Sequence, residues 1–200
     1  MLRTLFALLL IVTLAAPVPC APPKPRPYTG IAALVLHLPL AQPVANPTIV
    51  LYQEPGVGRI GEFPLTRLPR FALADGTLLA VMGKKGKWLK VAYDEAGREG
   101  WLESARSWEC QPWEQFLRGR LVRLLPGIRK EYHTLRNEPS DSASQLDPSS
   151  GQHDALRVIE VKGDWAMVMA GTAFYGWLRW RDADGRFLIS IDTGFTPQKH

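Results

Sequence analysis

The sequences GKWLKV at residues 86–91 and GDWAMV at residues 163–168 decide the fold of this 200-residue chain. In the first of them Trp88 and Lys90 alternate with Leu89 and Val91, which is the period of two that a half-buried strand requires. Turn-forming residues come before each stretch, at 83–86 and at 163–164, and they predict a tight connection from a preceding strand. Both stretches are therefore predicted to lie in β-hairpins.

The same motifs surround both stretches in the same order, which indicates an internal repeat. The first copy contains LYQEP at residues 51–55 and ends with GWL at 100–102. The second contains LRNEP at 135–139 and ends with GWL at 176–178. The copies differ mainly in a first loop, residues 56–74, that is longer in the first copy. Short strands separated by frequent turns predict two small barrels or sandwiches.

Each copy resembles the bacterial SH3-like domain, often called SH3b. The second copy matches that family through Arg136, Pro139-Ser140, DWAMV at residues 164–168 and its terminal GWL, whereas the first has Tyr52 where arginine is usual. The resemblance implies a mainly all-β fold, with two small SH3-like β-barrels joined by a short helix. It also implies that the ligands are short peptides, including cell-wall peptides, or a protein partner.

The chain is predicted to divide into six segments. They are a signal peptide at 1–21, a proline-rich tether and an apolar strand at 22–47, a first SH3-like domain at 48–105, a helical connector at 106–130, a second SH3-like domain at 131–190, and a tail at 191–200. Within the connector, apolar residues follow the three-four spacing of one helical face over 112–125. We expect this helix to pack on a barrel, with a membrane-surface helix as the alternative.

The N-terminus indicates export. One positive charge, a short apolar run at residues 5–16 and several prolines after it are typical of a secretory signal. The run is too short for a comfortable membrane span, and no transmembrane segment is expected after signal cleavage. The predicted location is periplasmic or extracellular. Cys20 leaves lipoprotein anchoring open, but Pro19 stands where that signal needs a small residue.

Composition argues against several classes of function. The net charge is +5, and lysine and arginine are scattered rather than clustered, so no nucleic-acid partner is expected. The four histidines have no metal-ligand spacing with cysteine, and we predict no catalytic residue, no metal and no cofactor. A thiol hydrolase that uses Cys110 with His133 or His153 is the one catalytic alternative.

The candidate ligand-binding residues are aromatic side chains that recur in kind in the two copies, together with one arginine of the second copy: Tyr52, Trp88, Tyr93, Trp101, Arg136, Trp165, Tyr175 and Trp177. Aromatic and arginine side chains are common at contact surfaces. The alternative for the four tryptophans is that they hold the barrels together. Trp180 is either an exposed contact or part of the packing of the last hairpin.

These observations predict a non-catalytic cell-envelope binding or scaffolding protein. Its partner is predicted to be a peptide, peptidoglycan or an envelope protein. One alternative is an adaptor that binds one envelope protein through the connector helix, and another is an accessory to a cell-wall hydrolase.

Overall fold

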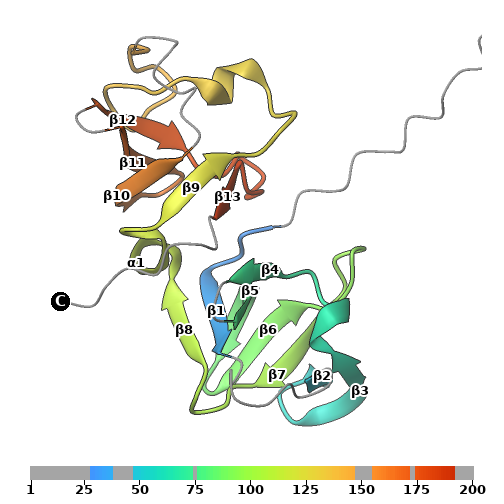
Figure 1. The fold of residues 1–200 in the computed structure, drawn as a ribbon. Coiled ribbons are helices and arrows are strands. Elements are labelled where there is room, and N and C mark those ends of the chain that lie inside the picture. Colours follow the sequence, from blue (N-terminus) through green and yellow to red (C-terminus); the bar gives the residue numbers. More distant parts are fainter. Residues whose placement is uncertain (1–27, 38–46, 74–75, 147–154, 172–173, 192–200) are drawn as a thin grey trace, which may run out of the picture.

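The computed structural model describes residues 28–37, 47–73, 76–146, 155–171 and 174–191 (Figure 1). These residues form two antiparallel β-sheets and one short α-helix, which confirms the predicted mainly all-β class. The predicted signal peptide, Cys20, the tether at 22–27 and all but the first residue of the predicted tail lie outside the described residues.

The first sheet occupies the lower half of Figure 1. Within the described residues it has eight strands in the order β3-β2-β7-β6-β5-β1-β8, with β4 paired to β5 beside this path. The strands are β1 (Ala32–His37), β2 (Thr48–Glu54), β3 (Val57–Pro64), β4 (Phe71–Leu73), β5 (Gly76–Lys85), β6 (Trp88–Ala92), β7 (Glu99–Glu103) and β8 (Glu109–Pro112). The long first loop predicted at 56–74 thus contains β3, β4 and a 3-10 turn, η1 (Leu65–Arg67).

The second sheet occupies the upper half of Figure 1. Its five strands among the described residues run in the order β12-β11-β10-β9-β13. They are β9 (Leu121–Leu124), β10 (Leu156–Lys162), β11 (Trp165–Ala170), β12 (Phe174–Arg179) and β13 (Ile189–Ile191). A second 3-10 turn, η2 (Lys130–His133), follows β9. The first sheet therefore takes in β1 and β8, which lie outside the range 48–105, and the second takes in β9, which lies before 131.

Three consecutive strands of each sheet have the same register. In β5–β6–β7, Lys90 pairs with Trp101, and Lys85 with Trp88. In β10–β11–β12 the corresponding pairs are Met167 with Trp177 and Lys162 with Trp165. The register shifts once in each first hairpin, between Val81 and Gly83 and between Val158 and Glu160. A β-bulge thus falls at the same place in both, and such bulges increase the local twist of a sheet.

Two hydrophobic clusters form the interior, and β1 and β5 contribute to both. Leu34 of β1 and Leu79 of β5 belong to a cluster inside the first sheet, which we call the first core. Val35, which follows Leu34, and Leu78, which precedes Leu79, belong to a second cluster. This cluster also includes residues of the second sheet, and we call it the shared core. Because successive side chains of a strand point to opposite faces, both faces of β1 and β5 are buried. This explains the unbroken apolar run at residues 32–36.

Aromatic rings join the two sheets in the shared core. The Trp113 ring lies 5.0 Å from that of Phe187 and 5.8 Å from that of Trp180, and Phe71 of β4 lies 4.8 Å from Phe187. The indole nitrogen of Trp113 also donates a buried hydrogen bond of 2.6 Å to the Thr29 carbonyl. Trp180 is fully buried, so of the two readings of this residue the exposed contact is wrong and the packing is confirmed.

The helix predicted over residues 112–125 ends much earlier than expected. Helix α1 spans only Trp113–Leu117, and residues 121–124 form β9 instead. Gly119 has a left-handed backbone with φ of 79° and donates its amide to the Val158 carbonyl, which turns the chain onto β10. The apolar residues whose spacing resembles one helical face are therefore divided between α1 and strand β9. None of the helices in the described residues is long and apolar enough to cross a membrane.

Candidate functional site

The outer face of the first sheet carries three of the predicted residues. Tyr52 of β2 pairs with Trp101 of β7, and the Tyr52 ring meets that of Trp88 edge to face at 5.3 Å. All three side chains are half-buried, because the alternation of β6 sends Leu89 and Val91 into the first core and leaves Trp88 and Lys90 on the opposite face. We call Tyr52, Trp88 and Trp101 the first aromatic face.

Charged side chains border the first aromatic face. The Lys90 ammonium lies 5.8 Å from the centre of the Trp101 ring and forms a 2.8 Å ion pair with Glu99. The hydrogen bond and the charge of Glu99 raise the pKa of Lys90 above its ordinary value. Lys90 therefore stays protonated beside the ring, where a cation is attracted by the aromatic quadrupole.

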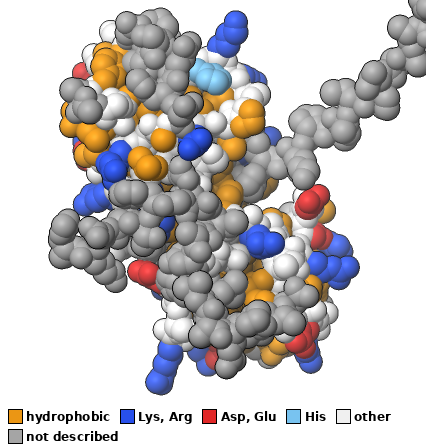
Figure 2. All heavy atoms as spheres, viewed as in Figure 1, with side chains coloured by type: hydrophobic (Ala, Val, Ile, Leu, Met, Phe, Trp, Pro, Cys, Tyr) orange, Lys and Arg blue, Asp and Glu red, His pale blue; other side chains and the backbone are white. Residues whose placement is uncertain are grey.

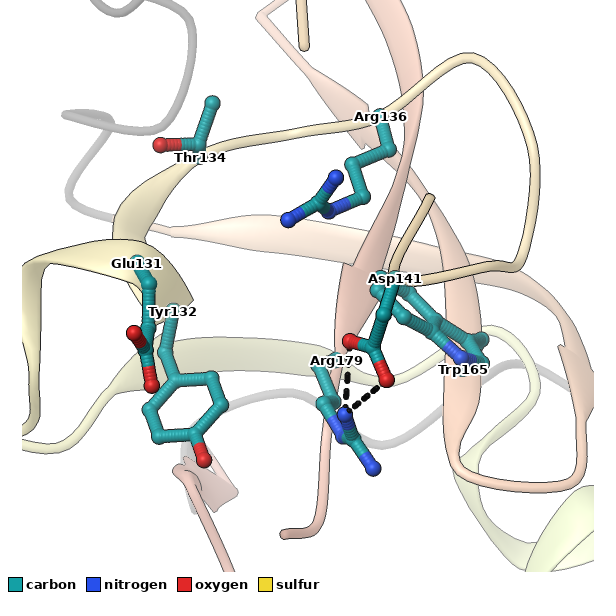
Figure 3. A pocket seen from close by; sticks show the side chains of 7 residues that line it. All are labelled: Glu131, Tyr132, Thr134, Arg136, Asp141, Trp165 and Arg179. Atoms are coloured by element: carbon teal, nitrogen blue, oxygen red, sulfur yellow. Dashed lines mark hydrogen bonds and ion pairs between the residues drawn. The ribbon is translucent and has the colours of Figure 1, made fainter. Parts of the chain in front are cut away.

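The corresponding face of the second sheet, which carries Trp165 in the place of Trp88, has a pocket of about 330 Å³. Its wall is lined by Glu131, Tyr132, Thr134, Arg136, Asp141, Trp165 and Arg179 (Figure 3). On β11 the inward position belongs to Ala166, the counterpart of Leu89, and Ala166 is part of the shared core. Trp165 therefore points to the opposite face, where it is nevertheless buried. The segment that follows η2 lies over the sheet and provides the outer wall of this pocket.

Arg179 is held in the pocket wall by several partners. Its guanidinium carbon lies 5.6 Å from the centre of the Trp165 ring, and its Nε donates to the Arg181 carbonyl at 3.2 Å. Its Nη1 donates to both carboxylate oxygens of Asp141 at 2.7 Å, as the dashed lines in Figure 3 show. A second carboxylate, that of Asp164, lies 3.9 Å from Nη2. The contact with the ring and these bonds hold the guanidinium in one orientation.

Arg136 faces the pocket from the segment after η2. It comes directly before residues 137–146, which we call the covering loop. Its backbone exchanges two hydrogen bonds with Trp177, of 2.9 and 2.7 Å, so it is tied to the edge of β12. Its Nη1 donates to the Ala143 carbonyl at 2.7 Å, and its guanidinium carbon lies 5.9 Å from the centre of the Trp165 ring. No carboxylate pairs with Arg136 among the residues that the structure describes.

The opposite side of the pocket is formed by η2. Figure 3 shows Glu131 and Tyr132 across the opening from Asp141 and Trp165, with Thr134 above them. Glu131 lies 3.5 Å from Arg129, and both side chains are largely exposed. The pocket therefore combines two guanidinium groups and two carboxylates with an indole, a phenol and a hydroxyl. Such groups hold polar ligands with aromatic or aliphatic parts.

The predicted residues divide between these two places and the interior. Arg136 and Trp165 line the pocket, and Trp177 is buried beside it under Lys162. Tyr175 is exposed on the same face of β12 as Trp177 but does not line the pocket. Tyr93 packs its ring against Phe63 at 5.3 Å beside the first core, away from the first aromatic face.

Sequence reasoning missed Arg179, Asp141 and Tyr132. One signal was available for the first of them: Tyr175, Trp177 and Arg179 alternate on β12, so Arg179 shares a face with two predicted residues. Asp141 and Tyr132 come from a loop and a 3-10 turn whose path over the sheet has no periodic signature.

Cys110 lies half-buried in β8 and packs beside the first core. Burial raises the pKa of its thiol above the ordinary value, which is opposite to the shift that activates a nucleophilic cysteine. Over residues 28–37, 47–73, 76–146, 155–171 and 174–191, no group of three or more His, Cys, Asp or Glu side chains could hold a metal ion. Lysine and arginine side chains are spread over both halves of the face in Figure 2 rather than gathered in one patch.

Comparison with known proteins gives no assignment: no protein-family model matches the sequence, and no curated protein matches it.

Proposed function

We propose that this chain is a non-catalytic, exported binding or scaffolding protein of the cell envelope, built from two SH3-like units, that binds peptides. The observation that carries the proposal is the second-sheet pocket, in which the guanidinium carbons of Arg136 and Arg179 lie 5.9 and 5.6 Å from the centre of the Trp165 ring, beside a cavity of about 330 Å³. Pockets for small ligands span roughly 300–1,000 Å³, and this one lies at the lower end of that range. It would therefore take one side chain or one chain end of a peptide.

The matching register of β5–β6–β7 and β10–β11–β12 supports two related units. Tyr52 bridges to Trp101 in the first sheet, as Arg136 bridges to Trp177 in the second. Gly100 and Gly176 occupy equivalent positions, and a side chain at either would meet a buried leucine, Leu51 or Leu135. A duplicated unit with an aromatic outer face gives two places at which an extended partner is contacted.

Peptides fit the chemistry of both faces. The first aromatic face offers half-exposed rings bordered by Lys90 and Glu99, and the pocket offers guanidinium groups beside an indole. Aromatic rings contact aliphatic and planar groups of a peptide, and arginine binds its carboxylates. Peptidoglycan peptides or an envelope protein segment are the ligands proposed.

The alternative of an adaptor that docks through the connector helix finds no free apolar surface on α1. Trp113, Phe116 and Leu117, which form its apolar side, are all buried in the shared core. Deletion of this helix is therefore expected to unfold the protein rather than release a partner, and the pocket remains the basis of the proposal.

The test is co-sedimentation of the purified chain, residues 22–200, with peptidoglycan sacculi at low and moderate salt. Pelleting that resists moderate salt is expected, and it should weaken in both Tyr52→Ala and Arg136→Gln. Arg67→Gln serves as a matched control, because Arg67 is an exposed arginine of η1 and belongs neither to the first aromatic face nor to the pocket lining. Failure to pellet, or equal loss with the control variant, would contradict a cell-wall ligand.

A further inference from the structure

Two carboxylates line the pocket: Glu131 pairs with Arg129, whereas Asp141 pairs with Arg179 of the pocket wall. Asp141 lies in the covering loop and accepts two hydrogen bonds from Nη1 of Arg179. The two partners differ sharply in exposure, since the side chain of Arg179 is 14% exposed and that of Asp141 is 68% exposed. The arginine is thus part of the wall, and the aspartate reaches it from the solvent side.

Arg179 does not depend on Asp141 for its position. Trp165, the Arg181 carbonyl and Asp164 contact the same guanidinium from other directions. Asp164 is itself held by Arg181, whose Nε donates to it at 2.5 Å. If the Asp141 carboxylate moves away, Arg179 therefore keeps its orientation toward the opening. A ligand that binds Arg179 then does not have to order this side chain, and ordering a side chain would cost binding free energy.

Arg136 supplies a second cation that is only partly used. Its described contacts are the Ala143 carbonyl and the Trp165 ring, neither of which carries a negative charge. A buried or half-buried guanidinium is most stable with a carboxylate partner, and such charge-assisted bonds are about twice as strong as neutral ones. Of the two guanidinium groups beside the indole, only that of Arg179 pairs with a carboxylate of the pocket lining, because Glu131 pairs with Arg129. Arg136 is therefore able to bind the carboxylate of a ligand.

We infer that the second-sheet pocket recognises the carboxylate of a peptide, which binds Arg136 and displaces Asp141 from Arg179. Asp141 then acts as a built-in competitor that occupies the site when no ligand is bound. The rest of the ligand would lie toward Tyr132 and Thr134 across the opening. This inference rests on the proposed function and names the ligand class for it: a peptide with a free chain-terminal carboxylate.

The experiment compares one peptide in two forms. Acetyl-Lys-Ala-Ala with a free C-terminal carboxylate and the same peptide with a C-terminal amide are titrated into the full mature chain, with binding followed by NMR chemical shifts. The acid is expected to bind at least about tenfold more tightly than the amide, because the amide cannot form charge-assisted bonds to either arginine. The difference should shrink as salt is raised.

Three variants separate recognition from folding. Asp141→Asn should bind the acid several-fold more tightly than the unaltered protein and leave the amide unchanged, since the competing charge is gone while a hydrogen-bonding oxygen remains. Arg136→Gln should bind both forms equally weakly. Arg67→Gln, in η1, should behave as the unaltered protein does. A thermal melt of each variant checks that the fold is kept.

The outcomes distinguish the two proposals. Equal binding of acid and amide at the pocket would overturn the carboxylate inference and leave peptide binding standing. Weaker binding of the acid by Asp141→Asn would overturn it as well, since Asp141 would then be part of the site rather than its competitor. Absence of binding of either peptide by the unaltered protein and by Asp141→Asn would overturn the inference even where sacculi are pelleted.

Discussion

Replacement of Trp113 by alanine is expected to destabilise both sheets together. The Trp113 ring is buried against Phe187, Trp180 and Phe116 in the shared core, and its indole nitrogen bonds to the Thr29 carbonyl. Truncation of a buried tryptophan costs about 3–5 kcal/mol. The carbonyl left without its donor adds about 1 kcal/mol or more. The sum approaches the total stability of many domains, which is about 5–15 kcal/mol.

The assay is urea unfolding combined with native-state hydrogen exchange. Because Val35 and Leu78 of the first sheet belong to the same cluster as Trp113, the exchange free energies of amides in β6 and β11 should fall by similar amounts. Trp113→Phe is the matched control: it keeps most of the apolar ring and loses the hydrogen bond, so a loss of about 1–2 kcal/mol is expected. Loss of protection in β11 with none in β6 would refute the reasoning, since the sheets would then unfold independently.

Three further predictions concern single positions. Gly176→Ala should lose about 1–3 kcal/mol of unfolding free energy in urea melts, because its new Cβ would lie 2.8 Å from that of the fully buried Leu135; an unchanged midpoint would mean that the backbone yields. Trp165→Ala should lower the melting temperature more than Trp88→Ala, because only Trp165 is buried, and the reverse order in calorimetry would contradict this. Cys110 should react slowly with iodoacetamide at mildly alkaline pH, because burial raises its pKa; stability should fall as pH rises above the thiol pKa of the unfolded chain, and alkylation as fast as in urea would argue against a buried thiol.

Local patterns predicted the strands well where one face is buried. The alternation of Trp88 and Lys90 with Leu89 and Val91 corresponds to β6, with the second pair in the first core. The turn at residues 163–164 lies between β10 and β11 as expected. These elements depend on side chains that are close in sequence, so a period of two is sufficient to find them.

The residues at 112–125 show why local patterns fail between elements. A three-four spacing is compatible with one helix, but Gly119 turns the chain and the later apolar residues pair with β10 and β13. Both arrangements bury the same residues, and only the distant partner strands decide between them. Tertiary pairing therefore overrides the local preference.

Two of the seven residues that line the pocket could be predicted, and the other five could not. Arg136 and Trp165 stand in recurring motifs, and the repeat singled them out. The ion pair of Asp141 with Arg179 joins residues 38 positions apart, through a loop that has no counterpart of similar path in the first sheet. A pairing of this kind follows from the fold and has no sequence period of its own.

The position of β1 has a consequence for the order in which the chain acquires its structure. This strand is the earliest described one in the sequence, yet it lies between β5 and β8, and both neighbours are synthesised later. Until then its apolar residues and its backbone groups have no partner, and such a segment is prone to mispair with other chains. Folding that waits for distant partners is slow, which lengthens the time during which β1 can mispair.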